Sequence, residues 1–266
     1  HSLGDIVQSD GFIENSVLIE FSDGTPNLST APAVWWDNPV LALPPSETSV
    51  AVLDQASAIY VFEDSRQSGG VHIAADGVGL VGRGDASLTL SDATPQQCNI
   101  FTGTPELPAV PDDGYNWRSC VVSGGARQRL WVEGSFRGRP VASELQLESY
   151  DTGIFLESTT RSVLRRVRTQ GGGYGVIFHS TSRNRLVDVR MSNHERYGII
   201  LGGGRAPDGS RGEPSNGNVL HRLRVTNIGV VRAPTALLLE GASSDTVVTD
   251  LLIAHGSRFG VLLFEN

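Results

Sequence analysis

The chain contains no lysine, and its 21 positive charges all belong to arginines. Catalysis by a lysine base or through a lysine Schiff base is therefore excluded. The histidines do not have the spacing of a metal site, so we expect no metal and no other cofactor. Scattered histidines such as His194 are expected at surface or corner positions. No apolar run is long enough to span a membrane, and the net charge of −8 argues against general binding to nucleic acid.

Only two cysteines are present, Cys98 and Cys120, near the ends of an irregular segment at residues 91–121. Their position favours a disulfide, which would stabilise the fold by about 3 kcal/mol. The alternative is two free thiols. A disulfide implies an oxidising compartment, so we expect a secreted, cell-surface or periplasmic protein. The sequence shows no signal peptide and starts at His1, which is compatible with removal of an export signal.

A repeated pattern dominates the C-terminal half of the chain. Five segments share a small first residue followed by alternating apolar residues, and they begin 22, 23, 38 and 24 residues apart. These segments are 153–157, 175–179, 198–202, 236–240 and 260–264. A period in the low twenties without a helical stripe predicts stacked coils of β-strand. The one longer interval contains an insertion, at residues 205–217.

A second apolar segment follows each of the first four after a polar turn. These second segments are 163–168, 185–190, 219–224 and 247–252. Apolar residues at their centre lie three apart, as Leu164 and Val167 do, which breaks strict alternation and predicts a bend. We therefore expect three short strands in each coil, joined by polar corners such as Ser192-Asn193.

This repeat resembles that of the right-handed parallel β-helix proteins of the pectate-lyase-like superfamily. The matching class has G-φ-x-φ-x-S near the first strand and N-x-φ-x-x-φ at the second, where φ is apolar. The segments that carry it are 175–180 with 184–189 and 198–201 with 218–223, and the resemblance covers about residues 70–266. It implies an all-β fold, a single-stranded right-handed parallel β-helix or solenoid.

The repeat and the resemblance together predict two regions. Residues 1–70 would form an N-terminal cap and the first strands, and residues 71–266 the parallel β-helix, with insertions at 91–121 and 205–217. We expect the first regular coil to begin near Val71. A cap is expected because an uncovered end of stacked strands promotes aggregation.

Charged residues in the first strands indicate which face points outward, because they would be costly inside a narrow apolar tube. Glu157, His179 and Glu240 have the same parity, so we place all three outside and residues of the opposite parity, such as Ile154, inside. Since strands of successive coils lie about 4.8 Å apart, Glu157 and His179 would be neighbours suited to acid and base roles. Glu240 would lie two coils beyond His179, at about 10 Å. These three are the candidate catalytic residues, and the alternative is an ordinary surface ion pair.

Candidate substrate-binding residues lie on the two insertions. They are Arg205, Asp208, Arg211, Tyr115 and Trp117. An arginine of the 205–217 insertion would neutralise a uronate carboxylate while the glutamate or the histidine moves a proton. This insertion emerges just after Gly202, which would leave a notch in the outer row. The two aromatic residues would line a groove or cover the tube.

An apolar row is expected beside the charged one on the same outer face. It consists of Phe155, Ile177, Ile200, Leu238 and Leu262. Such a stripe is too large to leave in water. Its cover would be an N-terminal segment, a loop or another subunit, and the last case would make the protein a homo-oligomer.

Two charged rows are expected on the second strands. The row at the bend alternates in sign, which indicates structural ion pairs. It contains Arg166, Asp188, Arg222 and Asp250. In the next row all charges are positive and repel one another, unless Asp188 or a bound polyanion relieves them. This row contains Arg168, Arg190 and Arg224, and we favour a structural role over a polyanion track.

The superfamily includes lyases, hydrolases, epimerases, phage tailspikes and non-catalytic modules, so the resemblance does not fix the chemistry. Catalytic motifs of its polygalacturonases, pectate lyases and alginate epimerases are absent, and no catalytic residue is carried over. We expect an exported protein that processes an extended, acidic polysaccharide as a lyase or a glycoside hydrolase. The alternative is a non-catalytic structural, adhesin or spike-type module that assembles or binds glycan.

Overall fold

The computed structural model describes residues 38–91, 98–99, 116–123, 128–138, 151–202, 215–229, 234–240, 243–256 and 258–264. These residues form strands and turns, which confirms the predicted all-β class. These described residues contain no helix, and therefore no helix long and apolar enough to cross a membrane.

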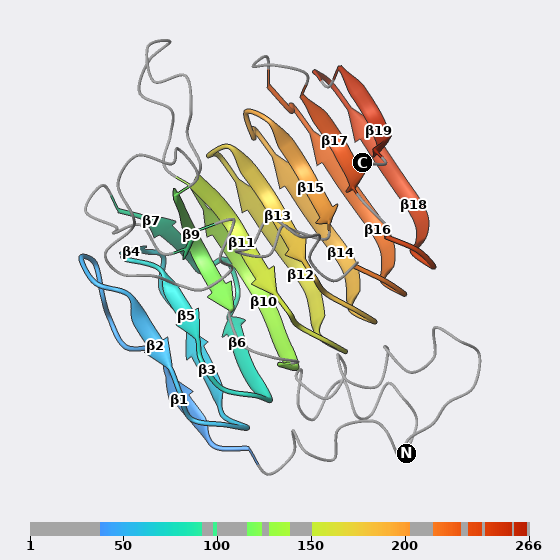
Figure 1. The fold of residues 1–266 in the computed structure, drawn as a ribbon. Coiled ribbons are helices and arrows are strands. Elements are labelled where there is room, and N and C mark those ends of the chain that lie inside the picture. The colour runs from blue at the N-terminus through green and yellow to red at the C-terminus, as the bar shows by residue number, and fades with distance from the viewer. Residues whose placement is uncertain are drawn as a thin grey trace, which may run out of the picture.

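Two sheets extend along the described part of the chain (Figure 1). Sheet A consists of β1 (Val40–Ala42), β3 (Ile59–Phe62), β4 (Arg66–Ser68), β6 (Val78–Gly82), β7 (Ser87–Leu90), β10 (Leu130–Arg137), β12 (Val163–Gln170), β14 (Arg185–Ser192), β16 (Val219–Thr226) and β18 (Val247–Ala254). Sheet B consists of β2 (Ala51–Leu53), β5 (Val71–Ile73), β8 (Cys98–Asn99), β9 (Asn116–Ser123), β11 (Asp151–Glu157), β13 (Tyr174–His179), β15 (Tyr197–Gly202), β17 (Thr235–Glu240) and β19 (Phe259–Phe264). Among the described strands, only β8 and β9 pair antiparallel.

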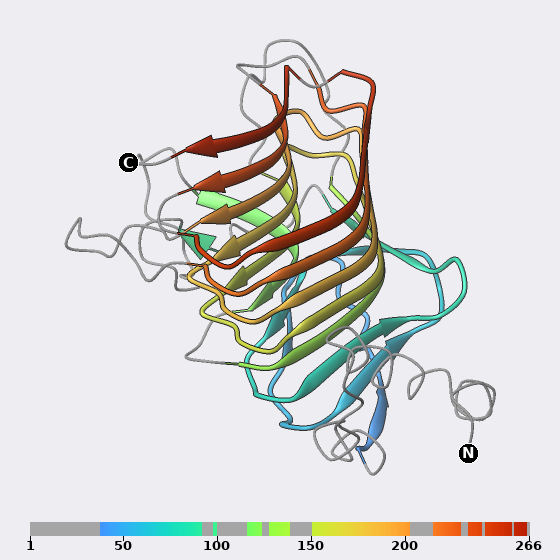
Figure 2. The same cartoon turned by 90° about the vertical axis from the view of Figure 1, so that its right-hand side faces the viewer.

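From β9 to β19, strands that follow one another in sequence alternate between the sheets, so each turn of the chain adds to both. For example, β11 pairs with β13 in sheet B, while β12 pairs with β14 in sheet A. Figure 2, turned to show the side of β18 and β19, displays the successive coils as a stack. The arrangement is solenoid-like, and it confirms the predicted stack of parallel coils.

The long strands of sheet A bend at one residue in a left-handed conformation. Arg166, Asp188, Arg222 and Asp250 have φ of 48°, 57°, 53° and 53°. Each lies between the two apolar residues that the sequence spaces three apart, which confirms the predicted bend. In β12 to β18 the strand continues through the bend, so these coils have two strands and not the expected three. Nearer the N-terminus the strand is divided, since β6 and β7 both pair with β10.

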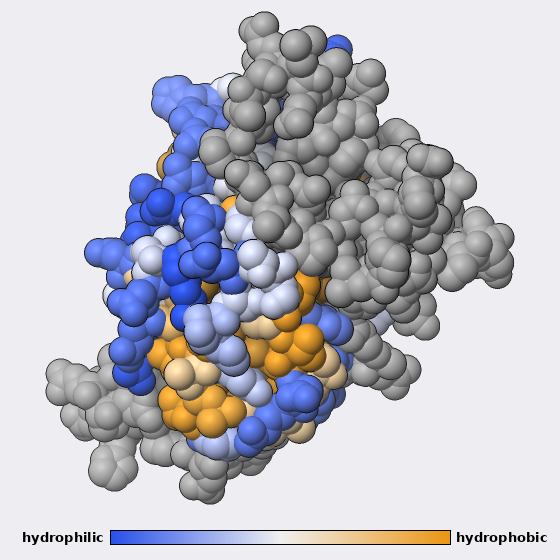
Figure 3. Space-filling model, turned by 90° about the vertical axis from the view of Figure 1, so that its left-hand side faces the viewer, coloured by the Kyte–Doolittle hydropathy of each residue, from blue (hydrophilic) through white to orange (hydrophobic). Residues whose placement is uncertain are grey.

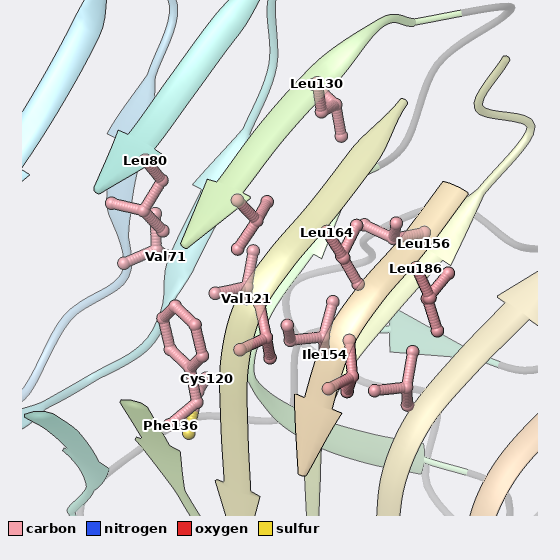
Figure 4. Close-up of a cluster of buried hydrophobic side chains, with 14 of the residues drawn as sticks. Val71, Leu80, Cys120, Val121, Leu130, Phe136, Ile154, Leu156, Leu164 and Leu186 are labelled. Carbon is pink, nitrogen blue, oxygen red and sulfur yellow. The ribbon is translucent and has the colours of Figure 1, made fainter. Parts of the chain in front are cut away.

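The interior is filled by apolar side chains of the predicted parity. Ile154, Leu156, Val176 and Phe178 have no exposed surface. In Figure 4, Ile154 and Leu156 of sheet B lie among leucines of sheet A, in one continuous core. Burying each such side chain stabilises the fold by about 1.5–3 kcal/mol, so the stack is held together mainly by this core.

The small first residue of the repeat is explained by close contact between coils. A Cβ added to Gly175 would lie 2.5 Å from the carbonyl oxygen of Gly198, and one added to Gly198 would lie 2.6 Å from that of Ala236. A larger residue at either glycine would push the neighbouring coil away.

The asparagine of the repeat is explained by buried main-chain donors. Asn184 and Asn218 have no exposed surface at the corner that precedes the sheet A strands. The Asn184 Oδ1 accepts a hydrogen bond from the main-chain N–H of Ser162 at 2.7 Å, and the Asn218 Oδ1 accepts one from that of Asn184 at 3.0 Å. Each asparagine thus satisfies a donor of the preceding coil that would otherwise be buried without a partner.

His194 occupies a corner, as expected, but it is buried. Its Nδ1 lies 2.8 Å from the carbonyl oxygen of Gly171, and its Nε2 lies 3.0 Å from the Thr169 Oγ1. Burial lowers the pKa of this imidazole from 6.5 to about 4, against the opposing effect of its hydrogen bonds to Gly171 and Thr169. The ring is therefore neutral at pH 7 and acts as a connector between coils.

The two ends of the described stack expose apolar residues. Parallel pairing begins at β1, N-terminal to the expected first coil at Val71. Val40 and Val52 are 59% and 53% exposed at this end, and Figure 3 shows hydrophobic surface there. At the opposite end Leu263 is 72% exposed. Residues 1–37 of the expected cap region 1–70 lie outside the described residues, as do most of the two insertions.

The asparagine corner can be tested with Asn184→Ala. The substitution leaves the buried N–H of Ser162 without its partner, so we expect the free energy of unfolding to fall by about 2–4 kcal/mol in urea denaturation. The control is Asn216→Ala, which removes an acceptor for the Ser244 N–H at an exposed corner and should cost less than about 1 kcal/mol. Equal losses in the two variants would contradict this account.

The buried histidine predicts a pH dependence of stability. Between the pKa of 6.5 in the unfolded chain and about 4 in the folded chain, the unfolded state binds more protons, so stability must fall as the pH is lowered. As the pH is lowered through this window, we expect the free energy of unfolding of the His194→Gln variant to fall by about 3 kcal/mol less than that of the unmodified protein. The measurement is urea denaturation at several pH values. The same pH dependence in both proteins would show that His194 does not titrate as described.

Candidate functional site

The outer row predicted from the repeat is formed in register on sheet B. Glu157 is paired with His179, His179 with Gly202, Gly202 with Glu240, and Glu240 with Phe264. Each step is the distance between neighbouring strands, about 4.8 Å. The spacing in sequence therefore predicted these neighbours correctly.

Glu157 and His179 form a close and largely buried pair. The Glu157 Oε1 lies 3.2 Å from the His179 Nδ1, and the two side chains are 12% and 11% exposed. The ring of Phe155 stacks on the imidazole with centroids 6.2 Å apart. Phe155 has no exposed surface, so an apolar wall shields one side of the pair.

Each member of the pair keeps one polar atom that has no hydrogen-bond partner among the described residues. These atoms are the Glu157 Oε2 and the His179 Nε2, and both are buried. Leaving such atoms unpaired costs free energy. Buried polar atoms without partners are a common feature of sites that bind a ligand or carry out chemistry. The pair is thus less exposed than the ordinary surface ion pair that was the alternative.

The pair has the chemistry of an oriented base. An ionised Glu157 can only accept, so it holds the proton of the imidazole on Nδ1. In a neutral ring the other nitrogen, Nε2, is then the basic atom. A carboxylate that orients a histidine in this way suits it to remove or deliver a proton.

The remaining predicted site residues are only partly placed. Glu240 lies in β17 at the position opposite Gly202, but its side chain is outside the described residues. Trp117 is placed only by its backbone, in β9 opposite Cys98. Tyr115, Arg205, Asp208 and Arg211 lie outside the described residues. The Gly202 carbonyl oxygen accepts a hydrogen bond from the buried Ser215 Oγ at 2.7 Å.

The expected disulfide finds no support in the structure. Cys120 is a buried thiol whose Sγ lies 3.2 Å from the carbonyl oxygen of Arg137 and 3.9 Å from that of Leu88. Figure 4 places it inside the core beside Phe136. The side chain of Cys98 is outside the described residues.

Three members of the apolar row next to the pair are buried within a single chain, and the other two are half-buried. Phe155, Ile177 and Leu238 are 0%, 3% and 8% exposed, and Phe155 and Ile177 pack with Tyr174 in a cluster separate from the main core. The rings of Tyr174 and Tyr197 stack 5.6 Å apart. Another subunit is thus not needed to cover these residues, and the proposed homo-oligomer gains no support. Sequence reasoning missed the stacked tyrosines, although each directly precedes the glycine of a repeat.

The charges at the bend form ion pairs on the outer face of sheet A. Arg222 lies 2.8 Å from Asp188, and Arg166 lies 2.8 Å from Glu133. The contact between Arg222 and Asp188 supports the structural interpretation of the alternating row, whereas Arg166 pairs with Glu133, which is outside that row.

A separate open cavity of about 570 Å³ lies at the corner where strands of sheet A end. It is lined by Thr89, Arg137, Gly138, Gln170, Gly171, Gly172, Asn193 and Glu195. Gly171 is also the residue whose carbonyl oxygen contacts His194. Sequence reasoning did not predict this cavity. Among the described residues no three histidine, cysteine or acidic side chains gather as a metal site would require.

Comparison with known proteins adds little. No protein-family model matches the chain, and no curated protein matches it in sequence. Among solved structures it is similar to a protein from Parabacteroides merdae named as a candidate glycosyl hydrolase, with 13% identity and a TM-score of 0.40. The alignment covers 77% of this chain and 80% of that one. A likeness this distant carries no argument, so fold and function must be argued from the chain itself.

Proposed function

We propose that the protein is a right-handed parallel β-helix of the pectate-lyase-like superfamily, exported from the cell, that processes an extended acidic polysaccharide at the outer face of sheet B. The observation that carries the proposal is the buried Glu157–His179 pair, with a 3.2 Å contact and two polar atoms that lack described partners. The pair lies in register beside Gly202, which has no side chain to block the row. In this proposal a linear glycan would run along the row, across successive coils.

Of the two reactions considered, β-elimination fits the row better than hydrolysis. Hydrolysis by paired carboxylates needs the two groups about 5–9.5 Å apart. Glu157 and Glu240 are three strand steps apart in the register, which is about 14 Å. Elimination needs one base beside the substrate and a group that stabilises the uronate carboxylate.

In the proposed reaction the His179 Nε2 removes the proton from the sugar carbon that carries the carboxylate. The electron pair left behind forms a carbon–carbon double bond, and the bond to the glycosidic oxygen breaks. That oxygen takes a proton and leaves as the hydroxyl end of the other fragment. Glu157 holds the imidazole and stabilises its positive charge. Because Nε2 is buried in the free protein, binding of the glycan must open the pair to the substrate.

The test is turnover of polygalacturonate, alginate and a neutral glucan, followed both by new reducing ends and by the ultraviolet absorbance of unsaturated uronates. We expect unsaturated product from an acidic glycan, and a loss of at least about 100-fold in His179→Ala. Glu157→Gln should lose less, because it keeps the shape of the pair and removes only its charge. The control is His221→Ala, whose ring contacts Thr249 on sheet A, and it should keep full activity.

Three outcomes would overturn the proposal in different ways. Reducing ends without unsaturated product would indicate hydrolysis. Unchanged turnover in a folded His179→Ala variant would remove the pair from catalysis. No product from any glycan would favour the non-catalytic module, with the pair as a buried structural contact.

A further inference from the structure

The like-charged row on sheet A is formed as a true ladder. Arg168 is paired with Arg190, and Arg190 with Arg224, in adjacent parallel strands. The three side chains are exposed, and that of Arg168 by 58%. We call these three residues the arginine ladder.

Nearby acidic residues do not neutralise the arginine ladder. Asp188, the expected partner, lies 2.8 Å from Arg222 instead. Glu133 lies 2.8 Å from Arg166, and Asp250 lies 3.5 Å from His221. Arg168 has one contact with a described carboxylate, at 3.9 Å from Asp85. The Asp85 carboxylate is fully exposed, so this contact offsets little of the positive charge.

Arg190 and Arg224 therefore form no ion pair with any described residue, although the whole chain has a net charge of −8. Like charges on neighbouring strands repel one another. The chain has more acidic than basic residues, yet no described acidic side chain pairs with Arg190 or Arg224. An anionic ligand would remove the repulsion.

A second row of polar side chains runs beside the ladder on the same face, two residues further along each strand. It consists of Arg137, Gln170, Ser192 and Thr226. Arg137 and Gln170 also line the cavity of about 570 Å³, together with Thr89, Asn193 and Glu195. The face thus combines a fourth positive charge with amide and hydroxyl groups, which suit the hydroxyls of a sugar.

We propose that this face of sheet A binds a linear polyanionic glycan, with its carboxylate or sulfate groups on the arginine ladder and its sugar hydroxyls against the second row and the cavity. Charge-assisted hydrogen bonds from guanidinium groups are the strong contacts in such a site. A glycan is favoured over a single-stranded nucleic acid, because neither row contains an aromatic ring on which bases would stack. The site is on the other sheet from the Glu157–His179 pair, and binding there does not depend on turnover at that pair.

The test is the affinity of the full chain for polygalacturonate, measured by titration calorimetry at several salt concentrations. The double substitution R190Q/R224Q should weaken binding by at least about tenfold and reduce the salt dependence by about one unit of slope per arginine. The matched control is R83Q/R258Q, which removes two exposed arginines that belong to neither row and changes the net charge equally. It should bind as the unmodified protein does.

The outcomes separate this site from the one on sheet B. Full binding by His179→Ala, together with the loss in R190Q/R224Q, would support two distinct sites. Equal losses in R190Q/R224Q and R83Q/R258Q would show only a general charge effect and overturn the proposal. Absence of binding to any acidic glycan would also overturn it, as would tighter binding to a single-stranded oligonucleotide than to polygalacturonate.

Discussion

Main-chain hydrogen bonds between parallel strands hold each coil about 4.8 Å from the next, and they fix which residues of successive coils become neighbours. The interior of this stack must be apolar, so its side chains form ladders such as Ile154 beside Val176. Polar exceptions include residues that satisfy a main-chain donor, such as Asn184. The same register aligns the outward residues of successive coils in rows, whether or not a row has a function.

The rows on the two sheets differ in their environment, and this difference separates the roles that we propose for them. On sheet B the Glu157–His179 pair is enclosed beside Phe155, where electrostatic interactions are stronger than in water. On sheet A the arginine ladder is open to solvent, where charges act mainly by attracting and holding an anionic chain.

The sequence predicted what depends on the period of the repeat. It placed Glu157 opposite His179, it assigned the inward parity of Ile154, and it located the bend between Leu164 and Val167. It could not predict features that arise from unrepeated parts of the chain. The cavity, which is lined by glycines at the corners of two coils, is one such feature.

Single residues also escaped prediction, for a related reason. The low exposure of His194 comes from contacts with another coil, which its position at a polar corner did not reveal. Spacing along the chain suggested a disulfide for Cys120, but only the direction of its side chain shows that the thiol points to the Arg137 carbonyl.

A double-mutant cycle on Glu157→Ala and His179→Ala, with unfolding free energies measured in urea, tests most directly whether the register brings this pair together. Residues in contact and shielded from water should show a coupling energy of about 1 kcal/mol or more. A coupling energy of zero would mean that the two side chains are apart in solution, and it would contradict both the register of sheet B and the site built on it.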